Sequence, residues 1–548
     1  MVEAAMTIPR PAVPSASNRL LQFNGDRDAI LQRVSERVYT RCLDAAERGG
    51  DDSLEYVLND VAFSEMRRLE KSSNRRHQRQ FQRWHDLANR LLRMSEAEKR
   101  DELQSLIEHY SADIVGNFNP RVYRFATGIL PPAMSFLLSP VANWREGVAA
   151  FRQASEKVEV QGPIDDIRRL AERGTLIFTP THSSNLDSIL LGWGLSSAGL
   201  PPVTYGAGKN LFSNVLISFF MHNLGAYRVD RRLRFRLYKE VLKEYSTVLL
   251  ERGYHSLFFP GGTRCRSNRV ESRLKLGLLG TALSAYVNNL QAGHGDHRMY
   301  IVPVTINYRL VLEAETLIDD YLAETGRSRY IIQDDEFSRL GRIVEFARKT
   351  TAHEGALHLA FGTPLDPFGN LVDERGDSID ARGRTLDPAG YVRDRDGVVV
   401  HARQRDGAYT RRLGSVLADC YRRLTVFLPT QVVARALMDE LCQAARERDI
   451  YRLLRCPEGA RKVPIQRVRA GVDRLCQRIR ARPEVGSLHP RMAQGTVTEV
   501  VEDAMRGLVT YHTHPVARQR DEYVEIEDIK LLYYYQNRLD HLPVEVAS

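Results

Sequence analysis

The first third of the chain has a helical pattern of apolar residues. Between residues 28 and 107 these recur three or four positions apart, which predicts amphipathic helices that each bury one face. The predicted buried faces comprise Leu31, Val34, Val38 and Cys42, then Leu54, Val57, Leu58 and Val61, and finally Leu103, Leu106 and Ile107. Ser95 and Glu98 have the spacing of a capping box and predict the start of the last helix. We expect a helical domain over residues 20–155, preceded by a disordered, Pro- and Ala-rich terminus at 1–19 that is not a signal peptide.

The middle third alternates short apolar runs with helical stretches. The candidate strands are 176–179, 203–205, 257–259, 300–304 and 357–361. Strands that alternate with helices are typical of an α/β fold, in which flanking helices cover a largely parallel mixed sheet. We therefore expect an α/β domain over residues 156–365.

Polar, turn-forming residues then interrupt this pattern. Between residues 366 and 409 the segments LVDERG, SIDARG, TLDPAG and VRDRDG follow one another at short intervals. Asp and Gly between single apolar residues favour small turns, so we expect a polar, hairpin-rich insertion here. Asp-Gly runs also occur in calcium sites, but the spacing of an EF-hand is missing from this segment. Residues 410–548 return to a helical pattern and are expected to form a C-terminal helical region.

Composition and charge narrow the choice of partners. The 548 residues are 43% hydrophobic and 27% charged, as in ordinary globular proteins. A net charge of +9 suits an anionic partner such as a phospholipid surface, a phosphorylated substrate or nucleic acid. The basic run at 67–93 surrounds Phe81 and Trp84, and we interpret it as a solvated helix face or a surface for anionic lipid, not as a nucleic-acid site. The six cysteines form no CxxC pair, which favours a reducing cytoplasm.

Two uncharged stretches bear on membrane attachment. Residues 125–143 and 210–227 lack charged side chains, but prolines interrupt the first, and Asn and His interrupt the second. A membrane-spanning helix needs about 20 predominantly apolar residues. Each stretch therefore either dips into one leaflet or belongs to the core, and we expect peripheral or monotopic attachment to the cytoplasmic face of a membrane. The histidines at 294, 297, 512 and 514 lack the context of metal ligands, so no metal site is expected.

Candidate chemistry centres on the segment 176–187. An apolar run ends at Pro180, and His182 and Asp187 follow before a second apolar run. This order predicts a buried strand, a turn and a helix that begins near Ser183, so that one helical turn brings the carboxylate beneath the imidazole ring. A carboxylate bonded to one ring nitrogen fixes the tautomer and leaves the other nitrogen to act as a general base. A His and an Asp five positions apart also occur by chance, as a helix cap and a surface residue.

Further blocks follow in an order that distinguishes these possibilities. HSSNLD at 182–187 resembles the H-x4-D signature of the glycerolipid acyltransferases, in their glycerol-3-phosphate acyltransferase branch. LGAYRVDR at 224–231 resembles the second block of this family, FPGGTRCR at 259–266 the third, and IVPV at 301–304 the fourth. Lys209 matches a lysine that many members carry between the first two blocks, and LYYYQN at 532–537 resembles an element near the end of this branch. The sequence has no dinucleotide, P-loop or hydrolase-elbow motif.

The resemblance assigns roles to individual residues. It implies His182 and Asp187 as catalytic residues, with phosphate bound by Lys209, Arg231, Gly262, Thr263, Arg264 and Arg266. In an extended segment, residues two apart point the same way, so Arg264 and Arg266 are expected to grip one anion. Arg269, Arg273 and Lys275 are expected to be solvated or to face lipid. The chain departs from the family at Gly261, where the third block usually has glutamate, and at Arg228, where the second usually has an aromatic ring.

The function that the resemblance implies is a glycerol-3-phosphate 1-O-acyltransferase of phospholipid biosynthesis. Its acceptor is glycerol 3-phosphate and its donor is acyl-CoA or acyl carrier protein, without a further cofactor. His182 removes the hydroxyl proton and Asp187 orients the ring. Dihydroxyacetone phosphate and lysophosphatidate remain alternative acceptors, since the sequence does not show the size of the pocket. A non-catalytic lipid-binding or scaffold protein is the alternative of another class, and Gly261 keeps it open. Acyl chain length and oligomeric state cannot be read from the sequence.

Overall fold

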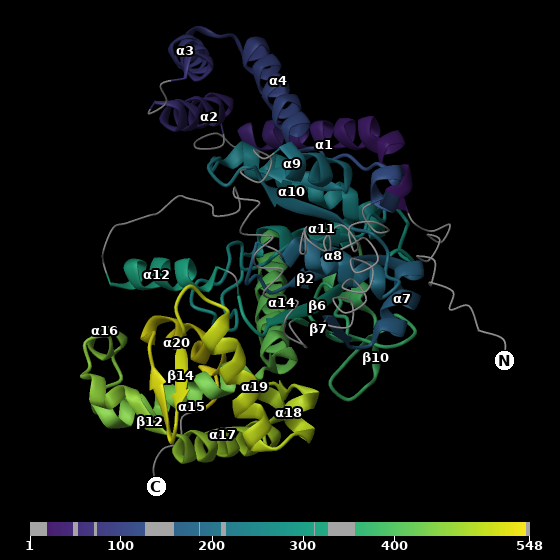
Figure 1. Cartoon of the computed structure of the whole chain (residues 1–548). Helices are drawn as coiled ribbons and strands as arrows, with labels where there is room; N and C mark the ends of the chain where they lie inside the picture. Colours follow the sequence, from purple (N-terminus) through teal and green to yellow (C-terminus); the bar gives the residue numbers. More distant parts are fainter. Residues whose placement is uncertain are drawn as a thin grey trace, which may run out of the picture.

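The computed structural model describes most of the chain. It covers residues 19–47, 53–70, 74–125, 158–185, 187–209, 215–311, 313–326 and 357–543. The terminus predicted to be disordered, nearly all of the first uncharged stretch and the start of the second lie outside these residues. The described residues form an α/β domain with N-terminal helices at one end and a C-terminal region at the other (Figure 1).

A seven-stranded sheet lies at the centre of the molecule. Its strands are β1 (Val158–Gln161), β2 (Gly174–Pro180), β3 (Thr204–Gly208), β4 (Ala226–Val229), β5 (Ser256–Leu257), β6 (Arg298–Tyr308) and β7 (Leu357–Phe361). They lie in the order β1-β7-β6-β2-β5-β3-β4. The five strands from β6 to β4 are parallel, whereas β7 and β1 run the opposite way. The predicted α/β class with a largely parallel sheet is confirmed, although β1 and β4 were not among the predicted strands.

Helices cover both faces of this sheet. One layer consists of α7 (Ile164–Arg173) and α8 (Asp187–Ser197), and the other of α11 (Leu276–Gln291) and α14 (Arg403–Leu424), with α10 (Arg236–Glu251) beside α11. Side chains alternate between the faces of a strand. Accordingly, Phe178 of β2 belongs to the apolar cluster of α7 and α8, and its neighbour Ile177 to that of α11 and α14. Because β2 is buried along its whole length, it is a firm support for the loop that follows it.

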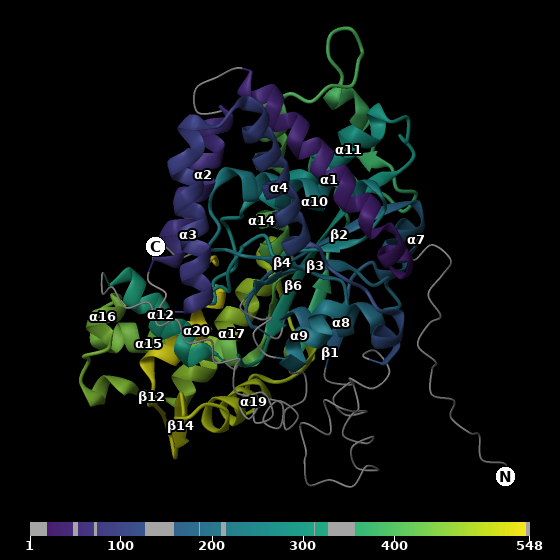
Figure 2. The ribbon, with the colours of Figure 1, turned by 90° about the horizontal axis from the view of Figure 1, so that it is seen from above.

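The N-terminal helices form their own core with α10. They are α1 (Phe23–Ala46), α2 (Leu54–Leu69), α3 (Arg75–Arg90) and α4 (Glu96–Ile114), which lie together in both ribbon views (Figure 2). The predicted capping box opens α4, because Ser95 accepts the Glu98 N–H and Glu98 accepts the Ser95 N–H. None of the helices in the described ranges is both long and apolar enough to cross a bilayer.

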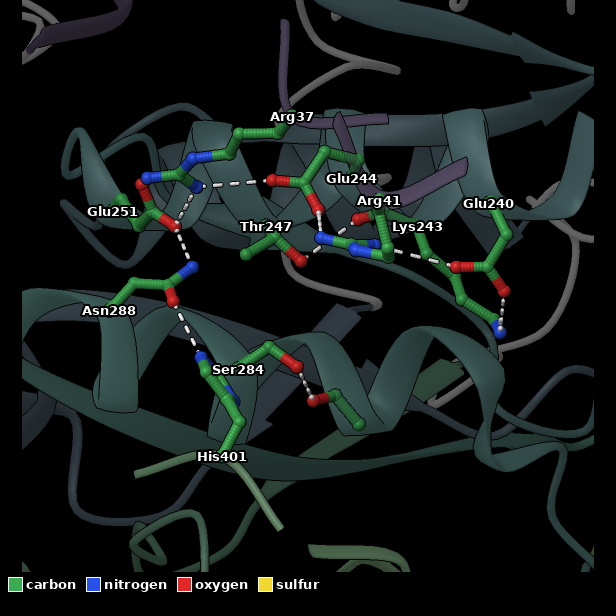
Figure 3. Close-up of polar contacts among 11 residues, drawn as sticks. Arg37, Arg41, Glu240, Lys243, Glu244, Thr247, Glu251, Ser284, Asn288 and His401 are labelled. Atoms are coloured by element: carbon green, nitrogen blue, oxygen red, sulfur yellow. Dashed lines mark hydrogen bonds and ion pairs between the residues drawn. The ribbon is translucent and has the colours of Figure 1, made fainter. Parts of the chain in front are cut away.

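Ion pairs attach α1 to the α/β domain (Figure 3). Glu244 of α10 is buried and accepts hydrogen bonds from Arg37 (3.1 Å) and Arg41 (2.6 Å) of α1. Arg37 also donates to Glu251 at 2.6 Å, and Asn288 of α11 donates to the same carboxylate. Since burial removes water from the Glu244 carboxylate, its arginine partners must replace the lost hydration.

A seven-residue repeat fills the segment after β7. Asp366, Asp373, Asp380, Asp387 and Asp394 begin successive units, and a glycine follows three positions later in each. In the four units other than the one at 387, Oδ1 of the aspartate accepts the N–H groups two and four positions further on. The strands β8 (Leu371–Val372), β9 (Ser378–Ile379) and β10 (Thr385–Leu386) join the units into a small antiparallel sheet. The hairpins expected in this insertion are therefore present, and their carboxylates are engaged by backbone rather than poised for calcium.

The C-terminal region is mostly helical. Its longer helices are α15 (Pro429–Ala445), α17 (Ile465–Arg480), α19 (Val497–Thr510) and α20 (Ile529–Gln536). It also contains a three-stranded sheet of β12 (Lys462–Pro464), β15 (Tyr523–Ile526) and β14 (Ala517–Arg520), which the helical pattern did not predict. Its apolar core is continuous with the α7 and α8 layer, and α20 packs on α12 (Ala314–Thr325). The domain boundaries drawn from the sequence stay predictions.

Candidate active site

The loop after β2 brings His182 and Asp187 together. Nδ1 of His182 lies 2.8 Å from Oδ2 of Asp187, whose side chain is fully buried. The His182 side chain is 13% exposed, so one edge of the ring reaches the surface. Within the described ranges the second ring nitrogen, Nε2, makes no hydrogen bond. A carboxylate on Nδ1 keeps the proton there and leaves the lone pair of Nε2 to accept another.

The contacts that hold Asp187 differ from those predicted. The helix does not begin near Ser183; α8 begins at Asp187 itself, so no helical turn separates the two side chains. Instead the loop wraps around the carboxylate, and the N–H groups of Ser183 (2.6 Å) and Ser184 (2.9 Å) donate to Oδ2. The hydroxyl of Tyr308, at the end of β6, donates to Oδ1 at 2.5 Å. A buried carboxylate requires such donors to replace its lost hydration.

The third sequence block forms the loop that holds His182 from the other side. The Cys265 N–H donates to the His182 carbonyl at 2.7 Å, and the His182 N–H donates to Oε1 of Glu271 at 2.7 Å. The ring of Phe259 stacks on the imidazole with centroids 4.2 Å apart and an interplanar angle of 27°. The peptide groups and the ring of His182 are thus fixed by residues from the neighbouring strand β5 and its loop.

This third-block loop turns back on itself. Gly262 has a φ of +74°, which favours glycine, and the Lys275 N–H donates to the Pro260 carbonyl at 2.7 Å. Turns fall at Pro260–Gly261 and again at Arg266–Ser267. The prediction of an extended segment was therefore wrong, because hydrogen bonds between the two ends of the loop fold it over the His182 peptide.

The two arginines of this loop do not converge on one point. Arg264 pairs with the buried Glu313 at 3.6 Å, and Arg266 pairs with the exposed Glu324 at 2.7 Å. These carboxylates lie at opposite ends of α12, eleven residues and about 16 Å apart along a helix. The expectation that both guanidinium groups point the same way is wrong here, since it required the extended backbone. Arg264 is the arginine that adjoins the His182 loop, because Glu313 also accepts the Asn185 N–H.

The other predicted phosphate ligands lie at the same edge of the sheet but farther from His182. Lys209 follows β3 and donates to Asp113 at 2.8 Å, with Asp230 at 3.9 Å. Arg231 follows β4 and is exposed, as is Thr263. In the sheet, β3 is the second neighbour of β2 and β4 is the third. At the usual spacing of parallel strands, the end of β3 lies about 10 Å and the end of β4 about 14 Å from the end of β2. The structure thus groups Arg264 with the His–Asp pair and places Lys209 and Arg231 on one flank.

Four residues around the pair, three of them buried and Glu271 partly buried, have no role in the sequence-based prediction. They are Tyr308, Glu271, Glu313 and Arg538. Glu313 accepts the Ser184 hydroxyl at 2.9 Å, and burial raises the pKa of its carboxyl. Arg538 is 2% exposed and donates to Asn307 of β6 at 2.8 Å, and burial lowers the pKa of its guanidinium. Tyr308 and Glu313 directly follow the fourth block, which is a signal that the sequence offered; Glu271 and Arg538 are placed only by tertiary contacts.

The tyrosine-rich element near the C-terminus packs against the third-block loop. Asn268, at a φ of +61°, donates its side-chain amide to the Tyr534 carbonyl at 3.2 Å. Asn537 donates to the Ser267 carbonyl at 3.0 Å. Tyr534 and Tyr535 are buried in the core, as aromatic packing predicts, and the neighbouring backbone and Asn537 support the third-block loop.

One cluster in the described part of the chain has the composition of a metal site. Glu159, His358 and His489 place one ligand atom each within 4.8 Å of one another, at the β1–β7 end of the sheet. His489 accepts the Arg491 N–H at Nδ1, so its proton is on Nε2, which donates to Glu159 at 2.9 Å. His489 is therefore engaged as a hydrogen-bond donor to Glu159, and burial lowers the pKa of both imidazoles. A cavity of about 490 Å³ beside Gly174 is likewise separate, because it lies at the opposite end of β2.

The sequence is similar to a known protein family and to several curated proteins. The Acyltransferase family model matches residues 157–307, which contain all four blocks. The glycerol-3-phosphate acyltransferase of Pseudomonas paraeruginosa is 25% identical over 272 residues, which is 50% of this chain and 28% of that protein. The enzyme of the same name from Ectopseudomonas mendocina is 24% identical over 391 residues, 70% of this chain and 41% of that protein. That of Haemophilus ducreyi is 35% identical over 154 residues, 28% of this chain and 18% of that protein.

The match is partial in length. The chain spans well under half of the length of these curated relatives. Among solved structures, the 1-acyl-sn-glycerophosphate acyltransferase PlsC of Thermotoga maritima is 14% identical, with a TM-score of 0.23 and coverage of 50% of this chain and 90% of that one. The region that matches the Acyltransferase family model ends at residue 307, so Tyr308, Glu313 and Arg538 lie beyond that region.

Proposed function

Since the chain belongs to the glycerol-3-phosphate acyltransferase branch of the glycerolipid acyltransferases, we propose that it transfers a fatty acyl group from a thioester to the sn-1 hydroxyl of glycerol 3-phosphate. The observation that carries this proposal is the 2.8 Å contact between Nδ1 of His182 and buried Asp187. It leaves a basic nitrogen at the sheet edge where ligands of open α/β folds bind.

The chemistry follows from the two side chains. Nε2 of His182 takes the proton of the acceptor hydroxyl, and Asp187 stabilises the imidazolium that forms. The alkoxide attacks the thioester carbonyl, the carbon–sulfur bond breaks, and the imidazolium returns its proton to the departing thiolate. General-base assistance of this kind is worth about 10²–10⁴-fold in rate. Because the acceptor attacks directly, no covalent acyl-enzyme is needed.

The acceptor phosphate is assigned to the basic residues at this edge. Arg264 is the best placed, since its partner Glu313 contacts the loop of His182. Lys209 and Arg231 add positive charge on the β3–β4 flank. A guanidinium gives phosphate two parallel hydrogen bonds, which suits it for orienting the acceptor. Dihydroxyacetone phosphate and lysophosphatidate carry the same phosphate and are the alternative acceptors.

The acyl donor is a thioester of coenzyme A or of acyl carrier protein. Both carriers are anionic and leave as a thiolate, so the net charge of +9 suits either. We also propose peripheral attachment to the cytoplasmic face of a membrane. This is supported by exposed Phe219 on α9 (Val215–Asn223), by exposed Ile189 on α8, and by the arginines of α3.

An acceptor screen with the purified chain tests the proposal. Radiolabelled glycerol 3-phosphate, dihydroxyacetone phosphate and lysophosphatidate are each offered with acyl-CoA and with acyl carrier protein thioester, and His182→Ala serves as the matched blank. We expect glycerol 3-phosphate to be preferred and the variant to lose at least about 10²-fold in turnover with an unchanged melting curve. Near-wild-type turnover by the variant would remove the base assignment. If no acceptor is used with either donor, the chain is instead a lipid-binding protein with an acyltransferase fold.

A further inference from the structure

The space beside Gly261 is occupied by a carboxylate. A Cβ atom placed on Gly261 would lie 2.4 Å from Oε2 and 2.7 Å from Cδ of Glu271, which is closer than real Cβ atoms approach. Gly261 is not one of the residues with positive φ, so its backbone does not itself require glycine. A side chain at 261 would therefore require the Glu271 carboxylate, ten residues further along the chain, to move away.

The same carboxylate binds the backbone of the candidate base. Oε1 of Glu271 accepts the His182 N–H at 2.7 Å. Oε2 is buried against Gly261 and makes no hydrogen bond of standard geometry with any described residue. The Glu271 carboxylate also lies in the electrostatic field of Asp187 and Arg538. It is thus oriented by the His182 loop on one side and by the glycine on the other.

The route of the chain explains how residue 271 reaches this place. The third-block loop leaves β5, passes over His182 and returns, since the Lys275 N–H donates to the Pro260 carbonyl at 2.7 Å. Glu271 precedes that closing contact by four residues, so the returning arm of the loop carries it back beside Gly261. The outgoing arm at Cys265 binds the His182 carbonyl while the returning arm at Glu271 binds its N–H.

We propose that Glu271 is a positioning residue for His182 and supplies, from the returning arm of the loop, the carboxylate that the family resemblance leads one to expect at position 261. This rests on the proposed acyltransferase function. Glycine at 261 then does not mean that a functional carboxylate is missing, because the small residue leaves the space that the Glu271 carboxylate occupies. The non-catalytic reading, which Gly261 kept open, loses its main support.

The protonation of Glu271 offers a readout of its buried place beside His182 that does not depend on turnover. Burial and, to a smaller extent, the charge of Asp187 raise the pKa of Glu271, the His182 N–H, Arg538 and the Gly261 N–H lower it, and the net result is a pKa of about 7 in place of an ordinary 4.5. The titratable groups that face it are His182, Asp187, Cys265, Tyr421 and Arg538. A raised folded-state pKa gives stability that is complete below about 4.5 and is lost as the pH rises through about 7. Glu271→Gln keeps an oxygen for the His182 N–H but does not titrate, so the melting temperature of wild type relative to this variant should fall across that interval.

Exchanging the two positions tests the proposal. Glu271→Gly should lower kcat by about 10–100-fold with little change in KM for the acceptor, because the base is misplaced rather than the phosphate. Gly261→Glu alone should fold poorly, since two carboxylates compete for one space. The double variant Gly261→Glu/Glu271→Gly should regain at least about 10-fold of the activity lost in Glu271→Gly. Ser272→Ala, at the exposed neighbouring position, is the control and should match wild type.

The outcomes separate this proposal from the proposed function. Wild-type turnover alone decides the acyltransferase activity. Independently of turnover, melting temperatures of the four combinations at 261 and 271 measure their coupling: Gly261→Glu should be far less destabilising when residue 271 is glycine. Additive effects on melting would overturn the shared-space argument. A double variant no more active than Glu271→Gly, or a Glu271→Gly variant with wild-type kcat, would overturn the positioning role.

Discussion

The hydroxyl of Tyr308 lies 2.5 Å from the Asp187 oxygen that does not face His182. The two oxygens of the buried Asp187 carboxylate therefore have different partners. Oδ2 contacts the imidazole and the loop, whereas Oδ1 contacts the end of β6. Tyr308 fixes the rotation of the Asp187 side chain, and through it the orientation of the His182 ring. The fourth sequence block, which forms β6, thus acts on the first through a side chain just beyond its end.

Tyr308→Phe should loosen the Asp187 carboxylate without removing its contact with His182. The change removes a hydrogen bond to a charged group, which contributes about 1.5–3 kcal/mol to stability. We expect kcat to fall about 10-fold, since the Asp187 carboxylate is no longer held from both sides, and KM for the acceptor to change little. Tyr300→Phe, on the same strand but with its hydroxyl near Gly376 at 3.4 Å, is the matched control and should keep full activity. Equal kinetics for the two variants would contradict the role given to Tyr308.

Arg264→Lys should raise KM for glycerol 3-phosphate about 10-fold at nearly constant kcat. Lysine keeps the charge but loses the planar fork that binds phosphate through two hydrogen bonds. Arg266→Lys should change KM less than about 3-fold, since Arg266 is paired with Glu324 at the far end of α12. Arg273→Lys, at an exposed position, is the control. Steady-state kinetics with the acceptor varied at saturating donor distinguish them; a fall in kcat or in melting temperature with KM unchanged for Arg264→Lys would show that this arginine serves Glu313 instead.

Glu244→Ala should loosen the N-terminal helices from the α/β domain. Glu244 is buried between Arg37 and Arg41, and losing a hydrogen bond to a charged group costs about 1.5–3 kcal/mol. Glu240→Ala removes a more exposed pair with Arg41 and should cost less than about 1 kcal/mol. Thermal melting compares the two variants, and limited proteolysis should release α1 to α4 from the first and not from the second. Equal stability would mean that the arginines contribute nothing beyond surface charge.

Membrane attachment should depend on charge. The protein should sediment with vesicles that contain anionic phospholipid and be partly released as salt rises, because such attraction is screened within about 8–10 Å at physiological ionic strength. Neutralising two exposed arginines of α3, in Arg79→Gln/Arg83→Gln, should reduce the partition coefficient roughly 30-fold, given about 1 kcal/mol for each basic residue near the surface. Release by detergent alone would indicate deeply inserted segments, and no sedimentation at low salt would contradict attachment.

Local patterns predicted five of the seven strands of the central sheet and the pairing of His182 with Asp187, but not how that pair is supported. The apolar run before Pro180 identified β2, and the order of the blocks identified the sheet edge, since parallel strands end on one side. The position of the α8 start was missed because the backbone at Ser183 and Ser184 folds around the Asp187 carboxylate instead of forming a helical turn. The extended arginine segment was missed for a similar reason, as the closing contact at Lys275 folds it.

Residues that act from a distance in sequence could not be found in this way. Glu271 has an ordinary loop context, and only the contact with Gly261 shows its place. Arg538 lies 356 positions after His182, yet its buried charge lies near Asp187 and Glu271. Such contacts carry no local periodicity, so a pattern of apolar and polar residues contains no signal for them.

Because Asn537 and Arg538 support the His182 site, the protein should become active only late in its synthesis. A ribosome must add more than 350 residues after His182 before these side chains exist. At about 5–20 residues per second this interval lasts roughly 20–70 s, during which the sheet can form but the loop beneath His182 lacks its support. Acyl transfer should therefore begin only when synthesis has passed Arg538, so a nascent chain does not consume thioester while it is still being made.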